Sequence, residues 1–184
     1  MEFNQYIFRK TSILLFWFIL SLIICPSILL AEQFNSKGTT DVYFSPNGGV
    51  TEAIVKEIDN AKQEILVQAY SFTSKTIAKA LLEAHKRGVK VVAVLDKSQK
   101  TANYSGATFL ANAGIPVYID SQHAIAHNKI MIIDRVTLIA GSFNFTRAAE
   151  EKNAENLLVI KGNKELVERY IKNFDEHKGH SSSY

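Results

Sequence analysis

The sequence predicts an α/β fold with a mixed, largely parallel central sheet and helices on both faces. Strand-like and helix-like segments alternate over residues 40–177, which is typical of sheets whose strands are joined by helices. Residues 89–96 (VKVVAVLD) are rich in valine, as in a strand buried on both faces. Residues 127–134 and 136–144 are too close for a crossover helix, so we expect one antiparallel pair there.

The remaining elements follow from hydrophobic periodicity and from helix start and stop signals. Ser74 and Asn163 are candidate helix caps, Gly88 and Gly114 are candidate stops, and the tail 178–184 is expected to be disordered. The other expected strands are 41–45, 64–72, 115–120 and 155–160, and the expected helices are 50–61, 74–87, 101–113, 145–151 (a short turn) and 163–177.

The first 31 residues form an appendage with the features of a secretory signal peptide. Arg9 and Lys10 precede an apolar run, and the segment ends in small residues at Ala31, where we expect cleavage. Residues 32–184 then form a single exported domain, periplasmic or secreted. The alternative is that residues 13–30 remain as an anchor in the inner membrane.

Composition adds little to this picture. The single cysteine, Cys25, lies in the leader, so the mature chain has no thiol, which suits an oxidising compartment. A formal net charge of +3 permits a polyanionic partner without requiring one.

Four polar side chains stand at the ends of the two neighbouring strands 127–134 and 136–144. His127 and Lys129 are two apart in one strand and therefore share a face, as Ser142 and Asn144 do in the next. An imidazole that attacks phosphorus or protonates a leaving oxygen, together with three donors for anionic oxygens, suits a phosphodiester substrate. Each residue also has a plainer explanation, as an exposed histidine, a surface lysine or a turn former after Gly141.

Two carboxylates accompany these residues. Glu155 opens an apolar strand, and it is either a solvated charge or a group that bonds the far nitrogen of His127 and fixes its tautomer. Asp134 belongs to the same motif, but its parity points it away from His127 and Lys129. We expect it to hold the corner between the strands by hydrogen bonds.

No zinc site is expected from the remaining histidines, because no pair has metal-ligand spacing with a third ligand and the mature chain lacks cysteine. These histidines are His85, His123, His177 and His180, with His123 at the rim of the site.

The pattern His127-x-Lys129-x4-Asp134 followed by Gly141-Ser142-x-Asn144 resembles the HKD signature of the phospholipase D superfamily. The wider sequence is similar to small bacterial Nuc-type endonucleases with one motif per chain. Stretches of this kind are YSFTS (70–74), KRGVKV (86–91), AGIPV (113–117), GSFNFTRAAE (141–150) and NAEN (153–156).

The resemblance implies a phospholipase D/nuclease-like fold and a phosphodiesterase that uses no metal or other cofactor and works through a phosphohistidine. It assigns catalysis to His127, Lys129, Asp134 and Glu155, and phosphate binding to Lys129, Ser142 and Asn144.

Physical reasoning supports a homodimer independently, since one imidazole cannot stand on both sides of phosphorus in one step. We expect nucleic acid as substrate, DNA more than RNA, with phospholipid head groups as the alternative. A non-catalytic phosphate-binding module is the third possibility.

Overall fold

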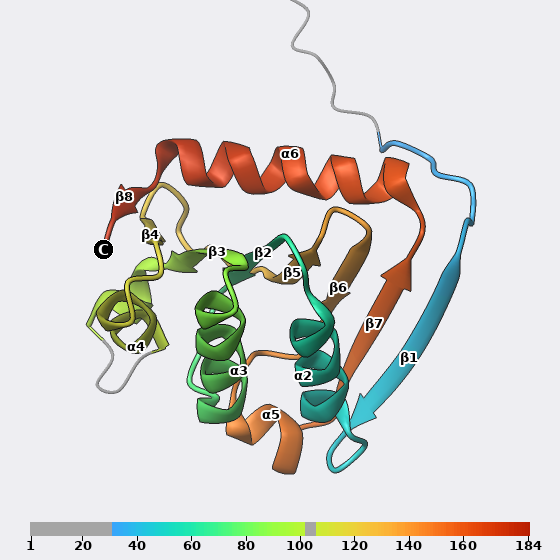
Figure 1. Ribbon diagram of the computed structural model, residues 1–184, viewed down its shortest axis with the longest axis horizontal. Helices are drawn as coiled ribbons and strands as arrows, with labels where there is room; N and C mark the ends of the chain where they lie inside the picture. Colours follow the sequence, from blue (N-terminus) through green and yellow to red (C-terminus); the bar gives the residue numbers. More distant parts are fainter. Residues whose placement is uncertain (1–30, 102–105) are drawn as a thin grey trace, which may run out of the picture. The chain divides into compact units, whose positions relative to one another are not determined.

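The computed structural model describes residues 31–101 and 106–184 of the chain. Its compact unit, Phe34–Tyr184, is built on one eight-stranded sheet in the order β1-β7-β6-β5-β2-β3-β4-β8 (Figure 1). The strands are β1 (Thr39–Ser45), β2 (Glu64–Ala69), β3 (Lys90–Asp96), β4 (Val117–Asp120), β5 (Lys129–Ile133), β6 (Thr137–Gly141), β7 (Glu155–Lys161) and β8 (Ser182–Ser183).

Helices cover both faces of this sheet, so the predicted α/β class and layering are confirmed. The helices are α2 (Val50–Asn60), α3 (Lys75–Lys86), a 3-10 turn η1 (Lys97–Lys100), α4 (Gly106–Asn112), α5 (Arg147–Glu151) and α6 (Lys164–His180). In Figure 1, α6 lies across one face, and α2 and α3 lie side by side on the other. Two apolar clusters result, one under α2, α3 and α4 and a smaller one under α6.

The sheet is mixed, but less of it is parallel than the sequence indicated. Only the β2–β3 and β3–β4 pairs are parallel. The chain returns from β4 to β5 through residues 121–128 without a helix, so β5 enters antiparallel to β2. The antiparallel pairs β5–β6, β6–β7 and β1–β7 extend the sheet from there.

Both predicted helix caps are present. Ser74 accepts a hydrogen bond from the Ile77 N–H at 3.3 Å, and Asn163 accepts one from the Leu166 N–H at 3.3 Å. These bonds satisfy backbone donors that the first helical turn leaves unpaired.

The prediction of a disordered C-terminus is wrong. Helix α6 continues to His180, and β8 then pairs with the edge of β4. The Tyr184 N–H donates to the Val117 carbonyl at 2.9 Å, and the Tyr184 hydroxyl bonds Thr108 at 2.7 Å. The unpaired edge of β4 therefore provides partners that hydrophobic periodicity does not reveal.

Among the described residues, no helix combines the length and the apolar character needed to cross a membrane. The expected signal peptide or anchor falls, apart from Ala31, on residues outside those that the structure describes.

Candidate functional site

The expected site residues gather at one end of the sheet. The C-terminal ends of β2 and β6 meet the N-terminal ends of β5 and β7 there, because β5 and β7 run antiparallel to their neighbours. Lys129 is in register with Ala69, and Glu155 is in register with Ser45 at the end of β1. Strand topology thus brings side chains from four strands to the same end of the sheet.

His127 is exposed and lies two residues before β5, so the expected strand begins later than predicted. Its imidazole packs on the Tyr70 ring, with the centroids 4.7 Å apart and the planes at 56°. The Tyr70 N–H donates to the Asn128 carbonyl at 2.8 Å, which ties this segment to the end of β2. Among the described residues no hydrogen bond reaches the imidazole, so both ring nitrogens are open to a substrate or a partner.

Lys129 is the first residue of β5 and is only 7% exposed. Its ammonium donates to the His127 carbonyl at 3.0 Å and lies 5.3 Å from the centroid of the Tyr70 ring. Burial lowers the pKa of Lys129, and the negative charge of Glu155 partly offsets this effect. An ammonium has three N–H donors, and here two of them remain for phosphate oxygens.

Tyr70 was not among the predicted site residues. It supports both His127 and Lys129, and the available signal was its place at the end of a strand that leads to the site.

Ser142 and Glu155 form a hydrogen-bonded pair. The Ser142 hydroxyl donates to Glu155 Oε2 at 2.6 Å and accepts from the Asn156 N–H at 3.1 Å. Asn153 Nδ2 donates to Glu155 Oε1 at 3.1 Å. The expected bond between Glu155 and His127 is not formed in the single chain; its carboxylate oxygens bond Ser142 and Asn153 instead.

Asn144 is half-buried, and its Oδ1 atom has no hydrogen-bond partner among the described residues. Its backbone carbonyl accepts from the Thr146 N–H at 2.7 Å, which fixes the turn after β6. A buried amide oxygen without a partner costs about 1–3 kcal/mol unless water or a ligand meets it. Because this oxygen only accepts hydrogen bonds, a contact of Asn144 with a phosphate oxygen has to come from its Nδ2 group.

Asp134 lies at the opposite end of β5 from Lys129, about 16 Å away at the usual rise of a strand. Its Oδ2 accepts from the Lys62 N–H at 2.8 Å, and its Oδ1 accepts from the N–H groups of Gln63 at 2.7 Å and Glu64 at 3.0 Å. Asp134 and Arg135 have positive φ values of 51° and 56°, so they form the tight turn into β6. Asp134 thus holds the corner and lies apart from the other residues of the motif.

The chain shows extensive similarity to known proteins. The family described as "Cardiolipin synthase, PLD-like domain" matches residues 54–178. This chain belongs to the phospholipase D superfamily. A protein of Rickettsia felis named "Phospholipase D" is 43% identical over 145 residues, which cover 79% of this chain and 71% of that protein. A "Mitochondrial cardiolipin hydrolase" of Mus musculus is 31% identical over 115 residues, covering 62% of this chain and 52% of that protein.

Solved structures agree with this assignment. The crystal structure of "a phospholipase D family member, Nuc" from Salmonella typhimurium has a TM-score of 0.77 and 40% identity, and the match covers 79% of this chain and 97% of that one. NucT from Helicobacter pylori shares the fold, with a TM-score of 0.74 at 21% identity, over 79% of this chain and 99% of that one. The present chain is therefore a hydrolase of the phospholipase D superfamily.

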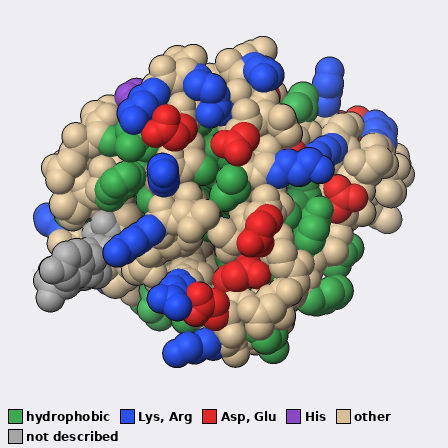
Figure 2. All heavy atoms as spheres, turned by 60° about the horizontal axis from the view of Figure 1, so that its bottom comes forward, with side chains coloured by type: hydrophobic (Ala, Val, Ile, Leu, Met, Phe, Trp, Pro, Cys, Tyr) green, Lys and Arg blue, Asp and Glu red, His purple; other side chains and the backbone are tan. Residues whose placement is uncertain are grey.

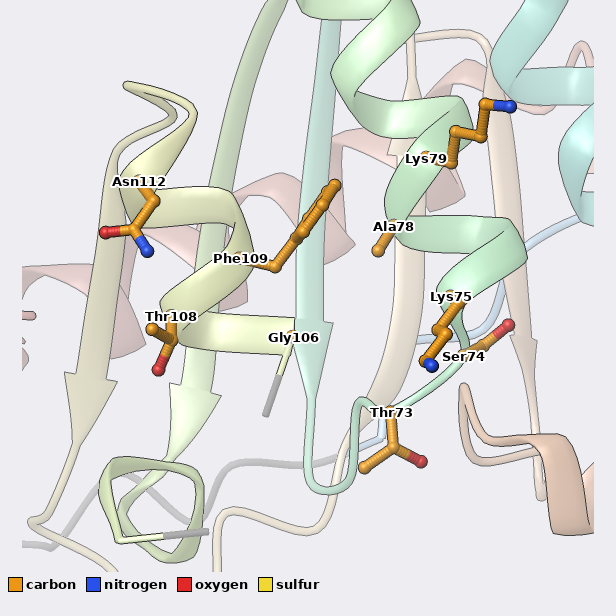
Figure 3. A pocket seen from close by; sticks show the side chains of 9 residues that line it. All are labelled: Thr73, Ser74, Lys75, Ala78, Lys79, Gly106, Thr108, Phe109 and Asn112. Atoms are coloured by element: carbon orange, nitrogen blue, oxygen red, sulfur yellow. The ribbon is translucent and has the colours of Figure 1, made fainter. Parts of the chain in front are cut away.

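In this phospholipase D superfamily member, a groove of about 490 Å³ lies between α3 and α4 (Figure 3). It begins at Thr73, three residues after Tyr70, and the Phe109 ring projects between the two helices. Phe109 is 43% exposed. The groove thus offers apolar surface close to the end of β2.

The surface charges of this superfamily member are mixed in sign. On the face shown in Figure 2, Lys and Arg side chains alternate with Asp and Glu side chains over most of the area. This arrangement agrees with the small net charge.

Three of the histidines outside the motif lie close together, which the sequence did not indicate. His123, His177 and His180 converge on Asp120, whereas His85 lies in the last turn of α3, outside that group. The sequence did not indicate this proximity, since no pair of these histidines has an obvious ligand spacing with a third group. The i,i+3 spacing of His177 and His180 becomes informative only once α6 is known to extend to His180.

Proposed function

We propose that this chain is an exported endonuclease that hydrolyses nucleic-acid phosphodiester bonds without a metal, through a phosphohistidine in a dimeric active site. The observation that carries this proposal is the pairing of His127 with Lys129. An exposed imidazole with both nitrogens open lies next to a buried ammonium with free donors, at one end of the sheet. A nucleophile beside a fixed positive charge suits attack on an anionic phosphodiester.

The chemistry needs two imidazoles. In the first step a ring nitrogen of His127 bonds to phosphorus, and the bond from phosphorus to the leaving oxygen breaks. His127 of the partner subunit donates its proton to that oxygen. In the second step the same partner imidazole, now neutral, takes a proton from water, the water oxygen bonds to phosphorus, and the phosphorus–nitrogen bond breaks.

Lys129, Ser142 and Asn144 would hold the non-bridging oxygens through both steps. In the structure the single O–H of Ser142 is donated to Glu155, so the hydroxyl has to turn from Glu155 to donate to a phosphate oxygen. Glu155 therefore acts by positioning Ser142 before substrate binds.

The surface around the site supports a second copy of the chain as the partner. Phe44, next to Ser45 at the end of β1, is 65% exposed, and Ile125, two residues before His127, is 57% exposed. These large, exposed apolar side chains lie beside a site that has only one of its two imidazoles. We therefore expect them to be buried in a two-fold interface.

Mixing experiments test the shared site. Native chains and His127→Ala chains, unfolded together and refolded in equal amounts, should give about one quarter of the native activity, since only dimers with two native chains retain both imidazoles. Independent sites would give about one half, and that result would refute the shared mechanism. His85→Ala, a histidine outside the site, is the matched control and should leave the activity of the mixture at the native level.

Phospholipid head groups are the second candidate substrate. The relatives named "Phospholipase D" and "Mitochondrial cardiolipin hydrolase" favour this, as does the groove between α3 and α4 with its exposed Phe109. The nucleic-acid reading is favoured by the likeness to Nuc over nearly the whole of that chain. In the part of the chain that the structure describes, no set of side chains suited to reading base edges is evident, so we expect little sequence selectivity.

A substrate panel with purified residues 32–184 decides between the two. Plasmid DNA, single-stranded RNA, and vesicles of phosphatidylcholine and of cardiolipin are each incubated with the native protein and with His127→Ala, which reveals any contaminating activity. Cleavage of DNA without lipid turnover is expected. Lipid turnover with intact DNA would make phospholipase the preferred function. If none of these phosphodiesters is hydrolysed, the remaining possibility is a non-catalytic phosphate-binding module.

A further inference from the structure

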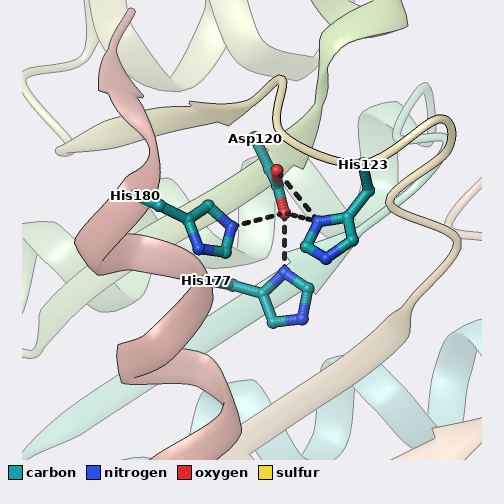
Figure 4. A group of neighbouring side chains, drawn as sticks. All are labelled: Asp120, His123, His177 and His180. Atoms are coloured by element: carbon teal, nitrogen blue, oxygen red, sulfur yellow. Dashed lines mark hydrogen bonds and ion pairs between the residues drawn. The ribbon is translucent and has the colours of Figure 1, made fainter.

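A second cluster of chemically active side chains lies away from the site, at the end of β4. It consists of Asp120, the last residue of β4, His123 in the following loop, and His177 and His180 in the last turns of α6 (Figure 4). One ligand atom from each residue can be chosen so that all four lie within 4.8 Å of one another. Lys129 and Ile119 are joined in register through Ala69 and Leu95, so the cluster lies three strands from Lys129, about 14 Å away.

The three imidazoles converge on one oxygen atom. Asp120 Oδ2 lies 2.6 Å from His177 Nδ1, 3.2 Å from His123 Nδ1 and 3.2 Å from His180 Nε2. An oxygen of a carboxylate has two lone pairs for hydrogen bonds, so three ring N–H groups exceed what Oδ2 can accept. The rings also crowd one another, with centroid separations of 4.8 Å and 5.3 Å.

The carboxylate is well prepared to act as a ligand. Asp120 is fully buried, and its other oxygen accepts from the Gln122 N–H at 3.1 Å, which fixes its orientation. A buried carboxylate needs a compensating positive charge, which a bound cation would supply.

We propose that Asp120, His123, His177 and His180 form a binding site for one divalent transition-metal ion, with zinc as the preferred occupant. Three imidazole nitrogens and one carboxylate oxygen are a donor set that tetrahedral Zn²⁺ takes in proteins. At zinc–ligand bonds of 2.0–2.1 Å, neighbouring ligand atoms are about 3.4 Å apart. Two of the three oxygen–nitrogen distances are already 3.2 Å, and the His177 contact of 2.6 Å has to open. Ligand atoms that are now up to 4.8 Å apart have to move closer by about 1.4 Å, which rotation of the imidazoles can supply.

The ion has a structural role, since four protein ligands leave no open position for a reacting group. It joins the C-terminal turn of α6 to the end of β4 and to loop 121–128, which leads to His127. The loop is already attached at two further points, because Ala126 donates its N–H to Asp96 at 2.8 Å and Lys97 donates to the His123 carbonyl at 3.0 Å. The ion therefore stabilises the fold and does not enter the phosphodiesterase chemistry.

Metal binding is tested directly on residues 32–184 purified with a tag that contains no histidine. After dialysis against a chelator, the protein is titrated with Zn²⁺ by calorimetry and with Co²⁺ by visible absorption, which reports tetrahedral geometry. One equivalent per chain is expected, and Zn²⁺ at about 100 times its Kd should raise the Tm by about 5–10 °C. Failure of Zn²⁺, Co²⁺, Ni²⁺ and Cu²⁺ to bind would overturn the proposal.

Variants locate the ion. His123→Ala and His180→Ala replace the two more exposed ligands, with side chains 45% and 26% exposed, so the chain should still fold. Each should weaken zinc binding by more than about 100-fold, beyond the usual cost of losing an outer-shell group. His85→Ala, the matched control, should bind like the native protein. Zinc binding that survives both cluster variants but is lost in His127→Ala would place the ion at the catalytic site and refute the proposal.

Circular dichroism shows whether a variant that no longer binds the ion is still folded. Each variant must show the native far-UV spectrum, and His123→Gln and His180→Gln replace any alanine variant that does not. Hydrolysis by the native protein at 20 °C should be equal with and without chelator. This readout concerns the phosphodiesterase mechanism, so its outcome is independent of the zinc titration.

Discussion

Replacement of Asp134 tests the view that one residue of the catalytic motif is structural. Asp134→Ala removes the acceptor for three backbone N–H groups and places alanine at φ 51°. A hydrogen bond to a charged group contributes about 1.5–3 kcal/mol, but the exposed N–H groups of Lys62 and Gln63 can bond water instead, so the three together contribute about 2–3 kcal/mol. The left-handed backbone adds about 1 kcal/mol for alanine.

The expected total is a loss of about 3–4 kcal/mol in the free energy of unfolding, which lowers the Tm by about 6–16 °C for a domain of this size. Urea titration and calorimetry measure this change directly. Asp134→Asn is the matched control. It keeps the Oδ1 acceptor for Gln63 and Glu64 and tolerates positive φ, so it should cost only about 1 kcal/mol.

The activity of Asp134→Ala distinguishes a structural role of Asp134 from a catalytic one. At 20 °C, where the variant is still folded, kcat/KM of Asp134→Ala should stay within about threefold of the native value, since Asp134 lies about 16 Å from Lys129. A native Tm combined with a large loss of kcat would refute the structural role and show that Asp134 reaches the reacting groups.

Three further predictions concern the site itself. His127→Ala should lower kcat by at least about 10⁴-fold with unchanged Tm, measured on bis(p-nitrophenyl) phosphate, because the nucleophile is lost; residual turnover above a few per cent would exclude that role. Ser142→Ala removes the 2.6 Å bond to Glu155 and a phosphate donor, and should cost about 10–1000-fold in kcat/KM; a neutral effect would show that the hydroxyl does not meet substrate. Burial lowers the pKa of Lys129, with Glu155 partly opposing, so its ammonium loses its proton at a lower pH than an ordinary lysine, and phosphate binding should decline early on the alkaline side. In the pH profile of Lys129→Arg, which stays charged, that decline should disappear, and its persistence would assign it to another group.

Local sequence information was enough to predict the elements near the site. Lys129 lies at the end of its strand as expected, and Asp134 holds the corner by hydrogen bonds as expected, although it does so from the turn after β5 and not from the opposite face of the strand. Ser74 and Asn163 were predictable because capping is a contact between residues three apart.

Features that depend on distant partners were not predictable in this way. Glu155 bonds Ser142 and not His127, and the spacing of these residues in the sequence does not show which of the two is the partner. Likewise, β8 exists only because β4 offers a free edge, and the histidine cluster forms only because α6 reaches that edge. These contacts join segments about 60 residues apart, beyond the range of helix or strand periodicity.

The short strand β8 has a practical consequence for the stability of the protein toward proteolysis. Among the residues that the structure describes, Ser182 and Ser183 pair with the outer side of β4, and Tyr184 holds them there through its N–H and its hydroxyl. Trimming by a carboxypeptidase would uncover a strand edge, which is a template for pairing with other chains. Residues 182–184 thus cover part of the β4 edge, and we expect their removal to favour pairing of β4 with other chains.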